Sequence, residues 1–118
     1  MILYIYSKCS TCQEALRFLK KNNIPHTVKE IVSTPPSTQE LEKMLSYYEG
    51  NSKKILNTSG MLYREMGLSQ KLEKMQLSEV LQLLCQNGML IKRPFLLGDG
   101  FGLTGFNEKL WSEKLKTN

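Results

Sequence analysis

The hydrophobic pattern at the start of the chain predicts a strand, a helix and a second strand. Residues 1–6, MILYIY, are apolar and rich in residue types that suit a buried strand. From Ser10 to about Asn22 apolar residues recur at helical spacing, and Ser10 with Gln13 has the pattern of a capping box. Residues 26–32, HTVKEIV, alternate as a strand does. The three elements predict a βαβ unit with parallel strands.

Short helical patterns fill the middle of the chain. A Pro-Pro turn precedes a helix that we expect to be capped by Ser37 and Glu40 and to end near Tyr48. Glycine, serine and asparagine separate the apolar groups that follow, which predicts further short helices at 53–56, 62–66, 70–74 and 77–86. We therefore expect residues 35–88 to form an all-helical insert.

The last part of the chain has the pattern of a hairpin followed by a helix. The apolar segments RPFLL and LTGF flank the glycine-rich GDGFG, and residues 107–115 form an amphipathic helical pattern. Trp111 and Leu115 are four apart, so both should pack that helix onto the sheet. The order of elements predicts one α/β domain over residues 1–118, with its core in 1–34 and 89–118.

Composition narrows the classes of protein that fit. The chain is 41% apolar and 23% charged with a net charge of +5, and its lysines and glutamates are interleaved, as on a solvated surface. We find no nucleic-acid motif, no membrane span of roughly 18 apolar residues and no signal peptide. We therefore expect a cytoplasmic protein that binds neither nucleic acid directly nor membranes.

The chain has three cysteines, of which Cys9 and Cys12 form a C-x-x-C pair at the predicted helix start. In a reducing compartment such a pair favours thiol chemistry over a structural disulfide. Cys85 is left over on the apolar face of a predicted helix. We expect a small buried side chain there, with a resolving thiol as the alternative.

The position of Cys9 suits a thiolate. It lies just before the helix, and Cys12 lies in the first turn, so both face unpaired N–H groups and the positive end of the helix dipole. Such surroundings lower a cysteine pKa from about 8.5 to between about 3.5 and 7.5, which makes Cys9 a nucleophile that Cys12 can resolve. A zinc site would need Cys85 and His26 as further ligands, and their positions do not have the spacing of a zinc finger, so no metal is expected. An inert structural C-x-x-C is the other alternative.

Several segments spread through nearly the whole chain resemble the arsenate reductase and Spx family, and its glutaredoxin-like branch in particular: YSKCSTCQEALRFL, STPPSTQEL, NTSGMLYREMGL, GMLIKRPFLL and GFNEKLW. The resemblance implies a thioredoxin-like four-stranded mixed sheet with a helical insert. That fold agrees with the order of elements predicted from the hydrophobic pattern.

The resemblance also implies roles for individual residues. Cys9 matches the nucleophilic cysteine that attacks arsenate, and Arg93 matches one of three arginines that hold the oxyanion, here an anion-binding or thiolate-stabilising cation. The other two arginine positions hold neutral residues, which disfavours arsenate as the substrate: Leu56 or Asn57, and Thr104 or Gly105.

Other positions of the resemblance shape the site. Pro94 is similar to a proline that is commonly cis in this fold and lies against the cysteine motif. Ser10 and Thr11, between the two cysteines, are expected to shape the same site. Gly50 corresponds to a glycine in the insert of Spx proteins, which makes it a candidate partner-binding residue. A turn glycine that ends a helix explains Gly50 without any partner, and this is the favoured interpretation.

Three functions follow from these patterns. The first is an arsenate-reductase-like thiol–disulfide oxidoreductase with a Cys9–Cys12 redox pair. It would need no bound cofactor and would be reduced by glutathione, glutaredoxin or thioredoxin. The second, implied by the resemblance, is an Spx-like redox-sensing transcription regulator that binds the C-terminal domain of the RNA polymerase α subunit. The third is an adaptor whose cysteines are inactive.

Overall fold

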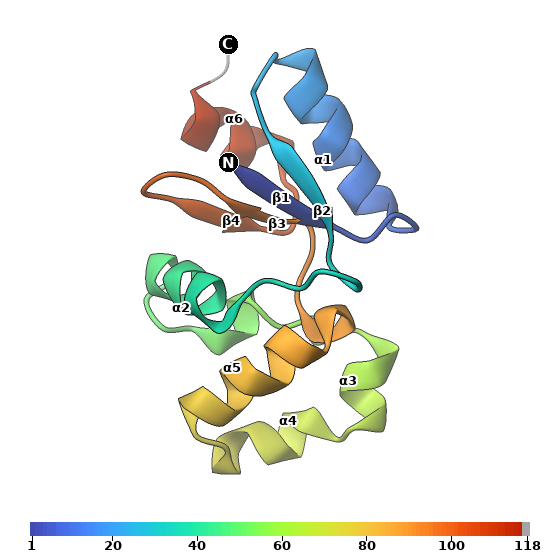
Figure 1. The fold of residues 1–118 in the computed structure, drawn as a ribbon, viewed down its shortest axis with the longest axis vertical. Coiled ribbons are helices and arrows are strands. Elements are labelled where there is room, and N and C mark those ends of the chain that lie inside the picture. The colour runs from blue at the N-terminus through green and yellow to red at the C-terminus, as the bar shows by residue number, and fades with distance from the viewer. Residues whose placement is uncertain (117–118) are drawn as a thin grey trace.

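A mixed four-stranded sheet forms the centre of the computed structural model, which describes residues 1–116. The strand order is β2-β1-β3-β4, with β1 and β2 parallel and the other pairs antiparallel (Figure 1). The predicted βαβ unit, hairpin and mixed sheet are confirmed. The strands are β1(Ile2–Ile5), β2(Thr27–Glu30), β3(Phe95–Leu97) and β4(Gly102–Thr104).

Two helices cover one face of the sheet: α1(Ser10–Lys21) and α6(Glu108–Leu115). Trp111 is 1% exposed and contacts Phe18 and Phe106 edge to face, with ring centroids 6.2 and 5.0 Å apart. Leu115 is half-buried against the same cluster. The predicted packing of the last helix onto the sheet is therefore confirmed. Positions 117 and 118 of the predicted core lie outside the described residues.

The segment between β2 and β3 is helical and forms the lower part of the molecule in Figure 1. Its apolar side chains form a second core cluster together with Tyr4, Phe95 and Leu97 of the sheet. The predicted helices are confirmed, although two of the short ones are partly or wholly tighter 3-10 turns. The helices are α2(Thr38–Tyr47), η1(Ser52–Lys54), α3(Met61–Glu65), α4(Leu68–Lys71), η2(Leu72–Lys74), α5(Leu77–Gln86) and η3(Gly88–Leu90).

Close backbone contacts join the helical segment to the sheet. A Cβ atom at Gly88 would overlap the carbonyl oxygen of Ile31, so only glycine allows η3 to approach the end of β2 this closely. An isolated antiparallel bridge pairs Leu56 with Ile91 just before β3. These contacts fix the direction in which the chain returns to the sheet.

The start of α2 is also tied to the sheet. Ser37 and Glu40 form the predicted capping box, with hydrogen bonds of 3.1 and 3.0 Å. The same Glu40 carboxylate accepts a 2.8 Å hydrogen bond from the hydroxyl of Tyr4, a residue of β1 that is 1% exposed. Burial, and then the hydrogen bond and charge of Glu40, raise the pKa of the Tyr4 phenol well above its usual range.

None of the helices in residues 1–116 has the length and apolar character that crossing a membrane requires.

We predict that Tyr4→Phe lowers the free energy of unfolding by about 1.5 to 3 kcal/mol at neutral pH, because it removes a hydrogen bond to a carboxylate. Since folding raises the pKa of Tyr4, the unfolded chain loses this proton first as the pH rises. The difference in the free energy of unfolding between the parent protein and Tyr4→Phe should therefore shrink above about pH 10. Urea unfolding of both proteins from pH 7 to 11 checks this, and equal stabilities at neutral pH would contradict it.

Candidate functional site

The site begins at the loop that joins β1 to α1. The backbone N–H of Cys9 donates a 2.9 Å hydrogen bond to the carbonyl of Tyr6, and the carbonyl of Cys9 accepts one of 3.1 Å from Gln13. This turn makes Cys9 the N-cap residue, with extended backbone at φ −93° and ψ 119°. The sulfur therefore lies at the N-terminus of α1, as the position of the C-x-x-C pair predicted.

The predicted capping box of Ser10 and Gln13 is wrong. Ser10 is the first helical residue and is exposed, and α1 has no side-chain cap. The side-chain amide of Gln13 instead donates a 3.1 Å hydrogen bond to the carbonyl of Ser7. The physical reason is the tight turn at Tyr6, which starts the helix one residue earlier and gives the cap position to Cys9.

The surroundings of Cys9 favour its thiolate. Burial raises the pKa of this thiol, but four favourable interactions outweigh burial and the net direction is downward. They are the backbone N–H and the thiol of Cys12, the backbone N–H of Thr11 and the positive charge of Arg93. These neighbours favour the thiolate of this half-buried sulfur, and the thiolate is the form of cysteine that acts as a nucleophile.

Cys12 has the opposite character. Its side chain is 0% exposed and packs in the cluster under α1. Burial raises the pKa of this thiol strongly, and the neighbouring Cys9 raises it further by accepting its hydrogen bond and by its negative charge. The two cysteines, which form no disulfide here, therefore have pKa values shifted in opposite directions, downward for Cys9 and upward for Cys12.

Arg93 and Pro94 approach the cysteine loop from just before β3. The Nη1 atom of Arg93 donates a 3.3 Å hydrogen bond to the carbonyl of Met89, and its guanidinium carbon lies 5.2 Å from the ring centroid of Tyr6. The Arg93–Pro94 peptide bond is cis and Pro94 is buried. Sequence left this isomer open. The Nε atom of Arg93 is buried and has no hydrogen-bond partner in the described part of the chain.

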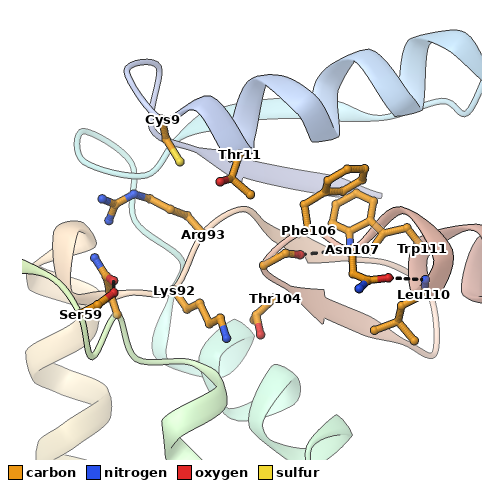
Figure 2. A pocket seen from close by; sticks show the side chains of 12 residues that line it. Cys9, Thr11, Ser59, Lys92, Arg93, Thr104, Phe106, Asn107, Leu110 and Trp111 are labelled. Atoms are coloured by element: carbon orange, nitrogen blue, oxygen red, sulfur yellow. Dashed lines mark hydrogen bonds between the residues drawn. The ribbon is translucent and has the colours of Figure 1, made fainter.

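An open cavity of about 460 Å³ joins these groups (Figure 2). Three predicted site residues, Cys9, Thr11 and Arg93, line it, while Cys12 and Pro94 are buried and absent from its lining. Ser10 is exposed and does not line it either. The other lining residues are Asn57, Ser59, Lys92, Thr104, Gly105, Phe106, Asn107, Leu110 and Trp111.

Part of this lining was not predicted from the sequence. Of the candidates for the family's other two arginine positions, Asn57, Thr104 and Gly105 line the cavity, Leu56 is buried and does not, and none of the four carries a charge. Lys92 lines the same cavity, and its place beside Arg93 in the segment IKRP was the available signal. The closeness of these segments could not be predicted, because it depends on how η3 and β4 pack.

Three other residues lie outside the cavity lining. Gly50 is exposed at φ +82°, and its N–H donates a 3.0 Å hydrogen bond to the carbonyl of Leu45, so it forms the turn that ends α2. Cys85 is half-buried rather than buried as predicted, because it packs against the outside of the core cluster of the helical segment, and its sulfur lies 3.2 Å from the carbonyl of Gln82. His26 has its Nδ1 2.7 Å from a backbone carbonyl.

The described residues contain no cluster of three or more histidine, cysteine or acidic side chains that could hold a metal ion.

The chain is similar to known proteins over nearly its whole length. The model of the ArsC family matches residues 4–113. The uncharacterized protein YusI of Bacillus subtilis (strain 168) is 41% identical over 114 residues, which cover 96% of each chain. The global transcriptional regulator Spx 2 of Bacillus anthracis is 27% identical over 109 residues, 92% of this chain and 82% of that protein.

Solved structures agree over nearly the whole fold. An ArsC family related protein from Bacteroides fragilis superposes with a TM-score of 0.85 at 39% identity, covering 95% of this chain and 96% of the other. A protein from Streptococcus mutans UA159, described as a possible arsenate reductase, gives a TM-score of 0.83 at 36% identity over 90% of both chains. The fold is thus the thioredoxin-like fold of these relatives, and the chain belongs to the ArsC family.

Proposed function

We propose that this protein is a thiol–disulfide oxidoreductase in which Cys9 is the nucleophile and Cys12 the resolving thiol. One observation carries the proposal. The Cys9 sulfur lies at the N-terminus of α1, where backbone N–H groups, the Cys12 thiol and the charge of Arg93 lower its pKa. Membership of a family that contains arsenate reductases and Spx regulators supports thiol chemistry at this position.

In the first step the Cys9 thiolate attacks one sulfur of a substrate disulfide. A bond forms between the Cys9 sulfur and that sulfur, and the substrate S–S bond breaks. The second half of the substrate leaves as a thiolate and takes a proton from solvent. Arg93 supplies a positive charge beside the three sulfurs that share the negative charge in this exchange.

Cys12 completes the reaction by attacking the Cys9 sulfur, and the proton that its thiol gives up passes to the departing half of the substrate. This releases the first half of the substrate as a thiolate, and the substrate has then gained two electrons while the two cysteines form a disulfide. The negative charge of Cys9, which raises the pKa of Cys12, is lost once Cys9 is in the mixed disulfide, while Arg93 still lowers that pKa. Attack by Cys9 on the substrate therefore lowers the pKa of Cys12, which favours the Cys12 thiolate in the second step.

The cavity favours a disulfide over arsenate. A tetrahedral oxyanion is best held by several guanidinium groups, which donate paired hydrogen bonds. Arg93 is one such group, but the residues at the two other positions, Leu56 or Asn57 and Thr104 or Gly105, are all neutral. An external thiol, such as glutathione, glutaredoxin or thioredoxin, would reduce the Cys9–Cys12 disulfide, with no bound cofactor. A cytoplasmic location is part of the proposal, because such reductants keep thiols reduced there.

A second candidate function is a regulator of the Spx kind. The relatives called global transcriptional regulator Spx match 90% or more of this chain, so the likeness is not confined to the cysteine motif. The family resemblance then names the C-terminal domain of the RNA polymerase α subunit as the partner, with oxidation of Cys9 and Cys12 as the switch. Gly50, where an added Cβ atom would meet nothing within 4 Å, would lie at the contact.

We predict that Cys9→Ser lowers turnover of a small disulfide by at least about a hundredfold, because a serine hydroxyl stays protonated at neutral pH. Cys12→Ser should stop after the first step and accumulate the mixed disulfide with Cys9, which intact mass spectrometry detects. An assay coupled to NADPH through a thioredoxin or glutaredoxin system measures turnover, with arsenate as a second substrate.

Cys85→Ser is the matched control, because Cys85 is a free thiol on α5 that does not line the cavity. We expect it to retain the parent rate. Arsenate turnover that exceeds disulfide turnover in the parent protein would contradict the substrate preference, and full activity of Cys9→Ser would contradict the mechanism.

The regulator hypothesis predicts that the protein captures the C-terminal domain of the RNA polymerase α subunit, and that Gly50→Arg abolishes capture. Gly67→Arg is the control, because Gly67 also has a positive φ, of 62°, in open space, so both variants carry a left-handed backbone cost of about 1 to 2 kcal/mol. A pull-down with reduced and with oxidised protein measures binding. Recovery of no polymerase domain in either state would remove this candidate.

A further inference from the structure

The cavity beside Cys9 holds two positive charges, and none of its described lining residues is acidic. Lys92 and Arg93 leave the backbone in opposite directions, Arg93 alongside Cys9 and Lys92 toward Thr104 (Figure 2). The positive charge of Arg93 already acts on Cys9, because it lowers the pKa of that thiol. The charge of Lys92 is thus available at a second place in the cavity, separate from the reacting sulfur.

The position of Lys92 is fixed by its neighbours. Its backbone N–H donates a 2.9 Å hydrogen bond to the carbonyl of Ile55. The end of its side chain lies over Gly105, where a Cβ atom would be 3.2 Å from Cε and 3.9 Å from Nζ of Lys92. Gly105 also has a φ of +70°, which favours glycine. The absent side chain at this position therefore leaves room for the lysine.

Thr104 and Gly105 form the wall of the cavity beside Lys92, and two of their polar groups already have partners within the protein. The hydroxyl of Thr104 donates a 2.6 Å hydrogen bond to the carbonyl of Lys54, and the carbonyl of Gly105 accepts a 3.1 Å hydrogen bond from the indole of Trp111. A ligand that reaches this wall therefore meets the ammonium of Lys92 as its charged donor.

We propose that Lys92 is a specificity-determining residue, which binds a carboxylate of the disulfide substrate while the reacting sulfur of that substrate lies at Cys9. This inference rests on the proposed thiol–disulfide function. An ammonium is a compact point charge on a flexible stem, so it pairs with a carboxylate without the bidentate geometry that arginine requires. The separation of the two cations fits a ligand whose charge lies several bonds from its sulfur, as in the disulfides of amino-acid and peptide thiols.

Three small disulfides test the proposal, because they share one reactive bond and differ in charge: dithiodipropionate, which is anionic, bis(hydroxyethyl) disulfide, which is neutral, and cystamine, which is cationic. The reduced protein is mixed with each at low salt, and acid quench with mass spectrometry measures the second-order rate constant for loss of the reduced protein, with the mixed disulfide and the Cys9–Cys12 disulfide counted together as product. For Lys92→Gln we expect the ratio of the anionic to the neutral rate constant to fall about tenfold, which corresponds to about 1.4 kcal/mol. Using this ratio cancels any change in the reactivity of Cys9 itself.

Lys92→Glu gives the complementary result, because it should reverse the order and make cystamine the faster charged substrate. Lys71→Gln is the matched control, because it removes the same charge from an exposed position on α4 that does not line the cavity. Its ratio should equal that of the parent protein.

Two outcomes would overturn the assignment of Lys92. An equal loss of rate with all three disulfides would show that Lys92 acts on the fold or on Cys9, and an unchanged ratio would show that no carboxylate binds there. A parent protein that reacts with none of the three disulfides would instead contradict the proposed function, and with it this inference.

Discussion

The turn that makes Cys9 the N-cap of α1 determines the chemistry of the site. The hydrogen bond from the Cys9 N–H to the carbonyl of Tyr6 ends β1 and starts the helix within a few residues. The first N–H groups of a helix have no partner inside it, so they face whatever occupies the cap position. Here that atom is the Cys9 sulfur, and the same N–H groups that lack helical partners stabilise its thiolate.

Sheet topology then brings the cation to the thiol. β1 and β3 are antiparallel neighbours, with Tyr4 opposite Phe95, so the loop that follows β1 and the segment that precedes β3 meet at one end of the sheet. That segment carries Arg93 and Pro94. Tyr6 contacts both segments, because its carbonyl accepts the hydrogen bond from the Cys9 N–H and its ring lies under the Arg93 guanidinium. The antiparallel pairing of β1 and β3 thus brings Cys9 and Arg93 to the same end of the sheet.

Local patterns predicted what depends on local structure. The strand at the start, the capped helix at Ser37 and the helix of Trp111 each follow from spacing within a few residues. The cap of α1 was misplaced because Ser10 has the right residue type, while the tight turn back to Tyr6 decides where the helix begins. The burial of Cys85 was overstated, since it packs against the outside of the core cluster of the helical segment rather than within it.

The rest of the site required tertiary structure. Lys92 is adjacent to Arg93 in sequence, yet its place over Gly105 depends on the hairpin and on the bridge between Leu56 and Ile91. The family resemblance indicated which positions carry arginines in relatives, but not that Lys92 lines the same cavity. A contact between two distant positions, a lysine and a glycine, has no signature in a single sequence.

A pH titration of the ultraviolet absorbance of the thiolate shows whether Cys9 is the activated thiol. We expect one thiol of the reduced protein to titrate below the ordinary cysteine range, Cys9→Ser to abolish this titration, and Arg93→Gln to move it to higher pH, because each change acts on the pKa of Cys9. Titration of every thiol in the ordinary range or above it, or an early titration that persists in Cys9→Ser, would contradict the activation of Cys9.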